Sequence, residues 1–295
     1  MRRFFLVFGV FIVVFSSLRA QAGHRQISVS VLDFGDTSLG KSAAEQFRID
    51  FRTKGEFLVL DSELSRAAAK GIGYSGSLNM SLEEARDLGA AMASEFYLIG
   101  DAQTLRRSSS QSPIYYESYC SVFVVSARTG RLVFWDRPSF KNKNERAAVE
   151  DLTGYLAGHD TTQQCLRAIQ LAEENESSQR AIVVGISEPL IEEAPDDEKK
   201  VAEQGLRLPR PYRRLRPEYP ESAARAEAEA TVDVVVDVGS DGEVGQIQID
   251  RWAGFGLDEA TVATVRQMHF FPAMRNGVPI PMRVLLRYNF RKSSK

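Results

Sequence analysis

The chain has 295 residues, of which 43% are hydrophobic and 26% are charged, and its formal net charge at pH 7 is -2. This composition is typical of a soluble protein of two domains. It excludes the strongly basic class of nucleic-acid-binding proteins, so we expect no nucleic-acid partner.

The first 22 residues have the pattern of a secretory signal peptide. Arg2 and Arg3 form a short basic segment, residues 4–18 are an apolar run, and Ala20 and Ala22 form an A-x-A cleavage site. The apolar run is shorter than the roughly 20 residues that span a bilayer as a helix. The pattern therefore favours export to the periplasm, while retention of residues 4–18 as an inner-membrane anchor remains open.

Residues 23–186 alternate between strand and helix patterns. Ser81 and Glu84 have the spacing of a capping box, which predicts that a helix begins there. This order of elements predicts a mixed α/β sheet domain with a helical extension. The expected strands are residues 27–34, 57–60, 95–105, 115–127, 131–136 and 182–186, and the expected helices are 42–54, 62–70, 81–93 and 145–176, the last with a break near Gly158.

Residues 187–215 have the composition of a linker. Residues 188–203 are acidic and contain Pro189 and Pro195, and residues 207–216 are rich in arginine. Such charged segments with prolines usually remain solvated between domains.

Residues 216–295 have the pattern of a small second domain. Its elements are an Ala-rich helix at 221–229, a strand at 231–238, a hairpin turn at Asp241-Gly242, a strand at 244–252, a helix that starts at Leu257, and a strand at 282–290. In the last strand we expect Val284, Leu286, Tyr288 and Phe290 to face the core. The predicted class is α+β, with an N-terminal mixed α/β sheet domain, a linker, and a small C-terminal αββαβ domain.

The sequence predicts no catalytic residue, no metal site and no cofactor. Residues 71–76 match G-x-G-x-x-G, but they follow a helix rather than the strand that a nucleotide site requires. The three histidines lack a second ligand at metal-binding spacing. Cys120 and Cys165 are either two buried thiols or one structural disulfide, which an oxidising compartment would permit.

Residues 216–290 resemble the TonB C-terminal domain family. The chain departs from the family pattern at residues 252–255, Trp-Ala-Gly-Phe, where the family tends to have a small Ser-Gly stretch, so the sheet edge is expected to differ there. The matching motifs are Arg216-Pro217-Glu218-Tyr219-Pro220, Ser240-Asp241-Gly242, Gly256-Leu257-Asp258-Glu259-Ala260, Phe270-Phe271-Pro272-Ala273, Asn276-Gly277-Val278-Pro279 and a last strand that ends at Phe290.

The resemblance implies a protein that binds an outer-membrane receptor or another envelope protein by β-strand addition to its last strand, and that is not an enzyme. It implies either a transducer of inner-membrane energy for transport, which needs motor proteins as partners, or a soluble periplasmic adaptor without energy coupling. A homodimer also remains open. Carried over by position, the candidate partner contacts are Tyr219, Pro220, Arg283, Val284, Leu285 and Leu286.

Residues 27–137 are similar, more loosely, to the amino-terminal domain of TolB. The similarity lies in residues 31–34, 55–61 and 90–100, which are mostly hydrophobic. It implies a fold and identifies no site.

Overall fold

The computed structural model describes residues 25–108, 114–158, 160–182, 191–195, 201 and 205–292. The expected signal peptide or anchor at residues 1–22 lies outside these residues, as do residues 183–186 of the last strand expected in the first domain. In the part of the chain described here, no helix is both long enough and apolar enough to cross a bilayer.

The N-terminal part of the chain is built on one mixed sheet, with strand order β2-β1-β4-β5-β6 and β7 paired to β5. β1 is parallel to β2 and β4, whereas β4 and β5 form a long antiparallel ladder. β7 was not predicted, because Pro138 interrupts the strand pattern just before it. The strands are β1 (Ile27–Val31), β2 (Phe57–Val59), β4 (Phe96–Arg107), β5 (Tyr115–Ser126), β6 (Leu132–Asp136) and β7 (Ser139–Asn142).

Helices cover both faces of this sheet. α1 (Ser38–Arg52), α4 (Glu145–Ala157) and α5 (Asp160–Ile182) bury one face, around the aromatic side chains of Phe34, Phe47 and Phe51. α2 (Ser62–Gly71) and α3 (Leu82–Ala91) cover the other. The predicted capping box of α3 is confirmed.

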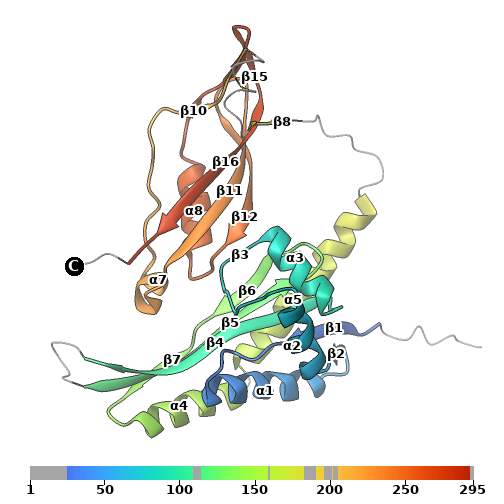
Figure 1. Cartoon of the computed structure of the whole chain (residues 1–295), viewed down its shortest axis with the longest axis vertical. Coiled ribbons are helices and arrows are strands. Elements are labelled where there is room, and N and C mark those ends of the chain that lie inside the picture. The colour runs from blue at the N-terminus through green and yellow to red at the C-terminus, as the bar shows by residue number, and fades with distance from the viewer. Residues whose placement is uncertain are drawn as a thin grey trace, which may run out of the picture.

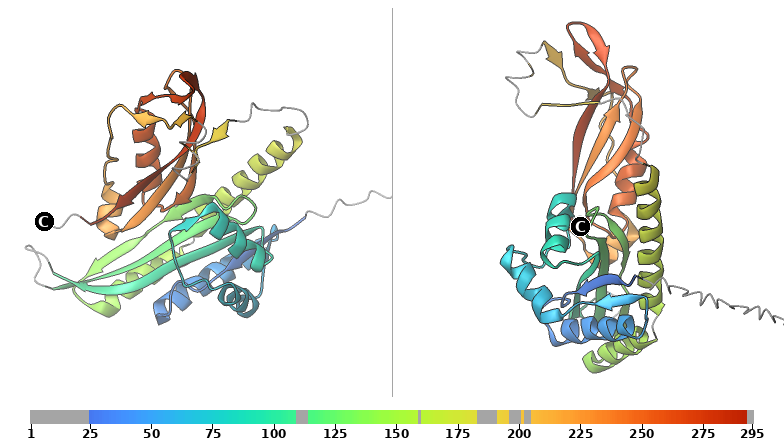
Figure 2. Two further views of the ribbon diagram at one scale, coloured as in Figure 1. Left: turned by 45° about the horizontal axis from the view of Figure 1, so that its top comes forward. Right: turned by 90° about the vertical axis from the view of Figure 1, so that its right-hand side faces the viewer.

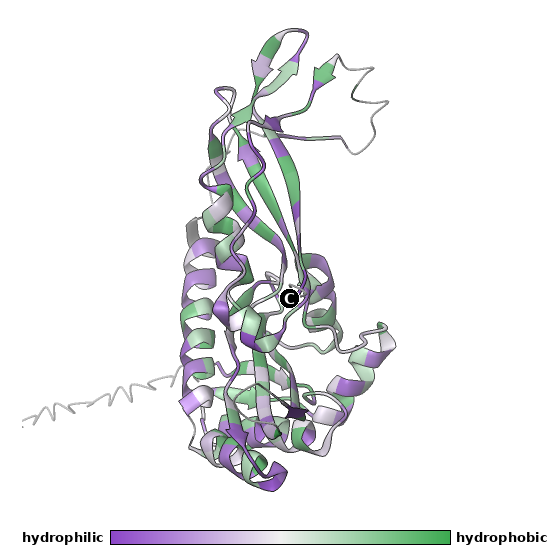
Figure 3. Cartoon of the chain, turned by 90° about the vertical axis from the view of Figure 1, so that its left-hand side faces the viewer, coloured by the Kyte–Doolittle hydropathy of each residue, from purple (hydrophilic) through white to green (hydrophobic). Residues whose placement is uncertain are grey.

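The C-terminal part has the predicted order αββαβ, which confirms the α+β class. α8 (Leu257–Val265) packs on the apolar face of β11, where Val232, Val234, Val236 and Val238 are buried. Green and purple segments follow one another along the strands of this sheet (Figure 3). The other elements are α7 (Glu221–Ala226), β11 (Ala230–Val238), β12 (Val244–Trp252), β13 (Phe270–Phe271), β14 (Ala273–Arg275), β15 (Val278–Ile280) and β16 (Met282–Phe290).

The described parts of the predicted linker lie against the C-terminal domain as short strands. β8 (Glu192–Glu193) pairs with β16, β9 (Leu206–Arg207) with β14, and β10 (Arg210–Pro211) with β13. Their composition predicted a solvated linker between the domains. The structure shows instead that these described residues are paired with strands of the C-terminal domain. The reason is that β13, β14 and β16 leave backbone groups open at their edges, which charge and proline content cannot reveal.

Cys120 and Cys165 lie in one apolar core, and both are free thiols. Of the two alternatives left open by the sequence, the structure therefore shows two buried thiols and not a disulfide. Both side chains are fully buried and pack as small apolar groups, and desolvation raises the pKa of each thiol.

The two domains are stacked end to end (Figure 1). The C-terminal sheet stands on the N-terminal sheet, and α5 rises from the first domain towards the second (Figure 2). The two domains share a sheet. β3 (Met80–Ser81) of the first domain forms an outer strand of the C-terminal sheet, whose order is β3-β12-β11-β16-β8.

Candidate functional site

The two long strands that flank β11 in the C-terminal sheet, β12 and β16, differ in regularity. β16 pairs with β11 without any shift in register, from Ala230↔Phe290 to Val238↔Met282. The ladder between β11 and β12 has two register shifts. Because bulges twist a strand and interrupt its row of hydrogen-bonding groups, β16 is the edge suited to accept a further strand.

The backbone groups of β16 alternate between β11 and the open side. The amide of Ala194 donates to the carbonyl of Arg283 at 2.8 Å, so the backbone of Arg283 faces away from β11. By the alternation of an antiparallel ladder, Leu285, Arg287 and Asn289 also face outward. Among the described residues, β8 is the strand paired on this side, and it pairs only with Met282 and Arg283. The outward groups from Leu285 onward therefore form an open edge.

The two faces of β16 have different chemistry. Val284 and Leu286 pack against the apolar core, as predicted. On the opposite face, Arg283 donates to both carboxylate oxygens of Asp237, at 2.6 and 2.9 Å, and Arg287 does the same to Asp233, at 2.7 and 2.9 Å. Forked pairs of this kind satisfy the buried carboxylates and fix both arginine side chains. Between them Leu285 is 53% exposed, so a strand added here would meet an apolar side chain flanked by two fixed charges.

Tyr219 and Pro220 lie near the far end of β16. The hydroxyl of Tyr219 donates to the carbonyls of Ala228 and Ala223, at 2.7 and 3.3 Å, and its ring lies 6.3 Å from that of Phe290. Pro220 is the N-cap residue of α7. The structure thus separates the candidate contacts into one group at the start of β16 and another beside its end.

We expect Tyr219→Phe to lower the free energy of unfolding by ~1 kcal/mol, since it removes the hydroxyl that joins α7 to residue 228. Chemical denaturation of the full chain measures the change. The ring is retained, so binding of a partner through it should be unchanged. An unaltered stability would show that the hydroxyl is equally well satisfied by water.

A second feature, the joint between the domains, was not predicted. β3 pairs with β12 through Met80↔Trp252 and Ser81↔Arg251. The indole of Trp252 is buried in the N-terminal core, where it stacks on Phe123 and its Nε1 donates to the carbonyl of Gly130 at 2.9 Å. The joint combines strand pairing with an inserted aromatic side chain.

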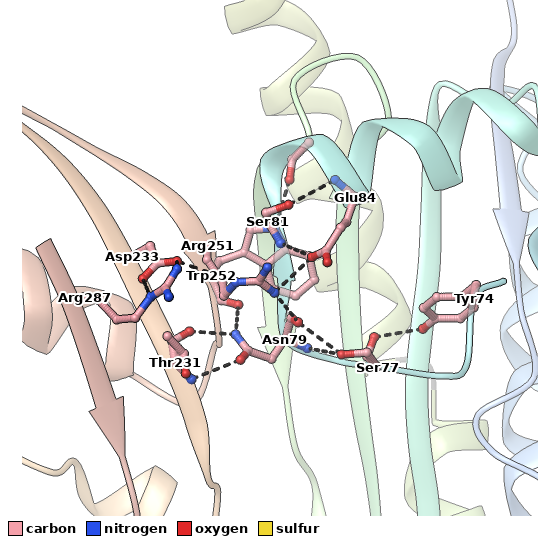
Figure 4. A network of polar contacts seen from close by, with 11 residues as sticks. Tyr74, Ser77, Asn79, Ser81, Glu84, Thr231, Asp233, Arg251, Trp252 and Arg287 are labelled. Carbon is pink, nitrogen blue, oxygen red and sulfur yellow. Dashed lines mark hydrogen bonds and ion pairs between the residues drawn. The ribbon is translucent and has the colours of Figure 1, made fainter. Parts of the chain in front are cut away.

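Polar side chains extend this joint (Figure 4). The amide of Asn79 accepts from the backbone N–H of Thr231 at 3.0 Å and donates to its carbonyl at 2.8 Å, and it also donates to the carbonyl of Trp252. Asn79 thus pairs with β11 as a neighbouring strand would. Nη1 of Arg251 lies 2.9 Å from the carboxylate of Glu84, whose side chain completes the capping box of α3.

The turn after Trp252 is where the chain departs from the family pattern. A Cβ at Gly254 would lie 2.5 Å from Cε1 of Phe123, and its φ is +71°, so the position requires glycine. Phe255 packs against Phe123 and Trp135 of the first domain. The departure at residues 252–255 was the one signal in the sequence that could have identified this joint.

A cavity of about 330 Å³ lies beside the joint, between β6, β12 and α8. Asp258 lines it and accepts from the amides of Ala253 and Gly254 at 2.9 and 2.8 Å. Burial raises its pKa to about 7, against the opposing effect of these two hydrogen bonds. No group of three or more His, Cys, Asp or Glu residues in the described part of the chain is arranged to hold a metal ion.

The raised pKa of Asp258 predicts that the free energy of unfolding depends on pH. Its pKa in the folded chain, about 7, exceeds the ordinary 3.8, so the folded state binds more protons between these values. The contribution of Asp258 to stability is therefore present below about pH 4 and is lost as the pH rises through about 7. The difference in unfolding free energy between parent and Asp258→Asn, measured by denaturation across this range, should change with pH. A constant difference would contradict the raised pKa.

Comparison with known proteins agrees with this geometry in the C-terminal part. The model of the family described as Gram-negative bacterial TonB protein C-terminal matches residues 216–291. A search of the curated proteins finds no match to the chain.

Several solved structures are similar to parts of the chain. The C-terminal domain of Pseudomonas aeruginosa TonB is 22% identical, with 30% of this chain and 89% of that chain covered and a TM-score of 0.26. The C-terminal domain of Salmonella enterica LpoB is 16% identical, with 40% and 86% covered and a TM-score of 0.28. The lipoprotein GNA1162 of Neisseria meningitidis is 12% identical, with 46% and 94% covered and a TM-score of 0.30.

The family match and the αββαβ order confirm the resemblance of the C-terminal residues, whereas the similarity to TolB stays a prediction. The family whose model matches here is thus shown for one part of the chain, and residues 216–291 form a TonB C-terminal domain.

Proposed function

We propose that the open edge of β16 binds an extended segment of an outer-membrane receptor or another envelope protein by β-strand addition. The observation that carries this proposal is the regular strand whose outward backbone groups, from Leu285 to Asn289, have no paired strand among the described residues. Strand addition satisfies such groups through main-chain hydrogen bonds, and alternate side chains supply specificity.

The contacts follow from the two faces of the strand. One set of partner side chains would lie beside Leu285, between the ion pairs of Arg283 and Arg287. The alternate set would lie beside Val284 and Leu286. A partner long enough to reach the end of β16 would meet Tyr219 and Pro220. No part of this scheme requires catalysis, and we propose a binding protein rather than an enzyme.

The N-terminal domain is part of the same binding unit. Because β3 and Trp252 fix the two domains together, a partner held at β16 is coupled mechanically to the first domain. Energy transduction for transport would further require residues 4–18 to remain in the inner membrane beside motor proteins. Without that anchor the same unit is a soluble periplasmic adaptor.

Site-specific photocrosslinking in cells tests the binding proposal. A photoreactive amino acid at Leu285 should give covalent adducts with envelope proteins, identified by mass spectrometry. The matched control is Leu64 on α2, which is 72% exposed and lies far from β16 in the sequence and on another domain. Adducts of equal yield and identity at both positions would contradict a specific edge.

Cell fractionation with determination of the N-terminal residue separates the two forms of the proposal. Intact Met1 in the inner membrane would support an energy transducer. A chain that starts at Gly23 in the periplasmic fraction would support the adaptor, because it retains no tether.

A further inference from the structure

The start of the β16 edge is occupied by a segment of the chain itself. β8 lies parallel to β16, with Glu192 beside Met282 and Glu193 beside Arg283. The amide of Ala194 extends the pairing by its 2.8 Å hydrogen bond to the carbonyl of Arg283. Residues 191–195 therefore already form an added strand at the start of the β16 edge, directly before the outward groups from Leu285 onward that the proposed function assigns to a partner.

Two side-chain contacts hold this segment. The carboxylate of Glu192 accepts from Nη2 of Arg275 at 2.6 Å, and Arg275 lies on β14, at the same end of the domain. Ala194 packs in a small apolar cluster whose buried members are Leu206, Ala273 and Met282. The arrangement recognises an acidic residue followed two places later by a small apolar residue.

The contacts that hold residues 191–195 on β16 are few, so this segment can dissociate from the strand. The segment forms a two-residue strand, and its ion pair is partly exposed, with 37% of the Arg275 side chain and 42% of the Glu192 side chain accessible. Exposed ion pairs of this kind contribute little to stability, because water screens the two charges. The segment is retained because it belongs to the same chain, where the effective concentration of a tethered strand reaches the millimolar range.

We propose that residues 191–195 are an internal strand ligand that competes with the partner for the start of the β16 edge. The proposal rests on the proposed function, since the competing partner is the strand captured there. It also specifies the chemistry of that partner. The captured segment runs parallel to β16, places an acidic side chain at Arg275, and places a small side chain at the position of Ala194.

A matched pair of proline variants of the full-length chain tests the competition. Ala194→Pro removes the N–H that bonds to Arg283. Glu193→Pro removes an N–H that points away from β16, because successive residues of a strand face opposite sides, and it serves as the control. Hydrogen exchange measured by NMR should show the Arg283 amide exchanging on the order of tenfold faster in Ala194→Pro than in the control.

The probe for the vacated edge is a synthetic peptide with the sequence of residues 188–197, added in trans. It should shift the amide resonances of residues 283–285 in Ala194→Pro at a concentration that leaves the parent chain unchanged. The same peptide with lysine in place of Glu192 should bind the variant more weakly, since it places a positive charge against Arg275.

The outcomes separate this inference from the proposed function. Equal exchange of Arg283 in the two proline variants, or equal binding of the peptide to Ala194→Pro and to the parent, overturns the internal ligand. If the peptide binds only Ala194→Pro but no variant gives envelope adducts at Leu285 in cells, the internal ligand stands and the proposed function is wrong. More Leu285 adducts in Ala194→Pro than in Glu193→Pro support both.

Discussion

Leu285→Pro should weaken capture of the envelope partner on the order of tenfold to a hundredfold while the C-terminal domain remains folded. The backbone N–H of Leu285 faces away from β11, so proline removes no hydrogen bond of the existing ladder. An added strand would lose one donor and would bury an unsatisfied carbonyl, which accounts for the size of the effect. Crosslinking yield or pull-down of the partner by purified full-length chain measures it.

Leu285→Ala is the control for the side chain, because it keeps the N–H and removes the exposed apolar group. A small effect of alanine beside a large effect of proline would identify main-chain pairing as the source of affinity. Circular dichroism verifies that both variants remain folded. Equal losses of binding in the two variants would indicate that the partner recognises the leucine side chain instead of the strand edge.

Trp252→Ala should separate the two domains. The indole is almost completely buried, stacks on Phe123 and donates to the carbonyl of Gly130. Truncation of a buried tryptophan typically costs about 3–5 kcal/mol, through lost burial and the cavity that remains. The side chain belongs to β12 but fills the N-terminal core, so we expect its truncation to weaken mainly the contact between the two domains. Thermal unfolding should change from one transition to two, and small-angle scattering should show a more extended particle.

Trp252→Phe is the matched control, since it keeps an aromatic ring at Phe123 and loses the hydrogen bond to Gly130 together with part of the buried ring volume. It should cost about 1–3 kcal/mol, the penalty of one unsatisfied buried carbonyl, and leave a single transition. If Trp252→Ala also retains one transition and the compact scattering profile, strand pairing through β3 is sufficient to hold the domains.

Local patterns in the sequence predicted the long strands and the helices of both domains, but not short strands such as β7. The capping box at Ser81 and Glu84 is present, and the alternation along the last strand correctly placed Val284 and Leu286 in the core. These features depend on neighbouring residues, so a single sequence contains the necessary information.

Pairings between distant segments could not be predicted in this way. β3 and β8 are two-residue strands without a pattern of their own, and they form only because another strand offers them an edge. The amide pairing of Asn79 with Thr231 joins residues far apart in the chain. The sequence left open whether Cys120 and Cys165 form a disulfide or pack as two buried thiols, since cysteine count and compartment do not determine which occurs, and the structure shows two free thiols.

Hydrogen exchange of the β16 amides with and without the captured partner tests the central claim most directly. Strand addition predicts slower exchange at Leu285, Arg287 and Asn289, whose amides face outward, and little change at Leu286 and Tyr288, which already pair with β11. Partner binding that leaves the three outward amides unprotected would show that the β16 edge is not the binding site.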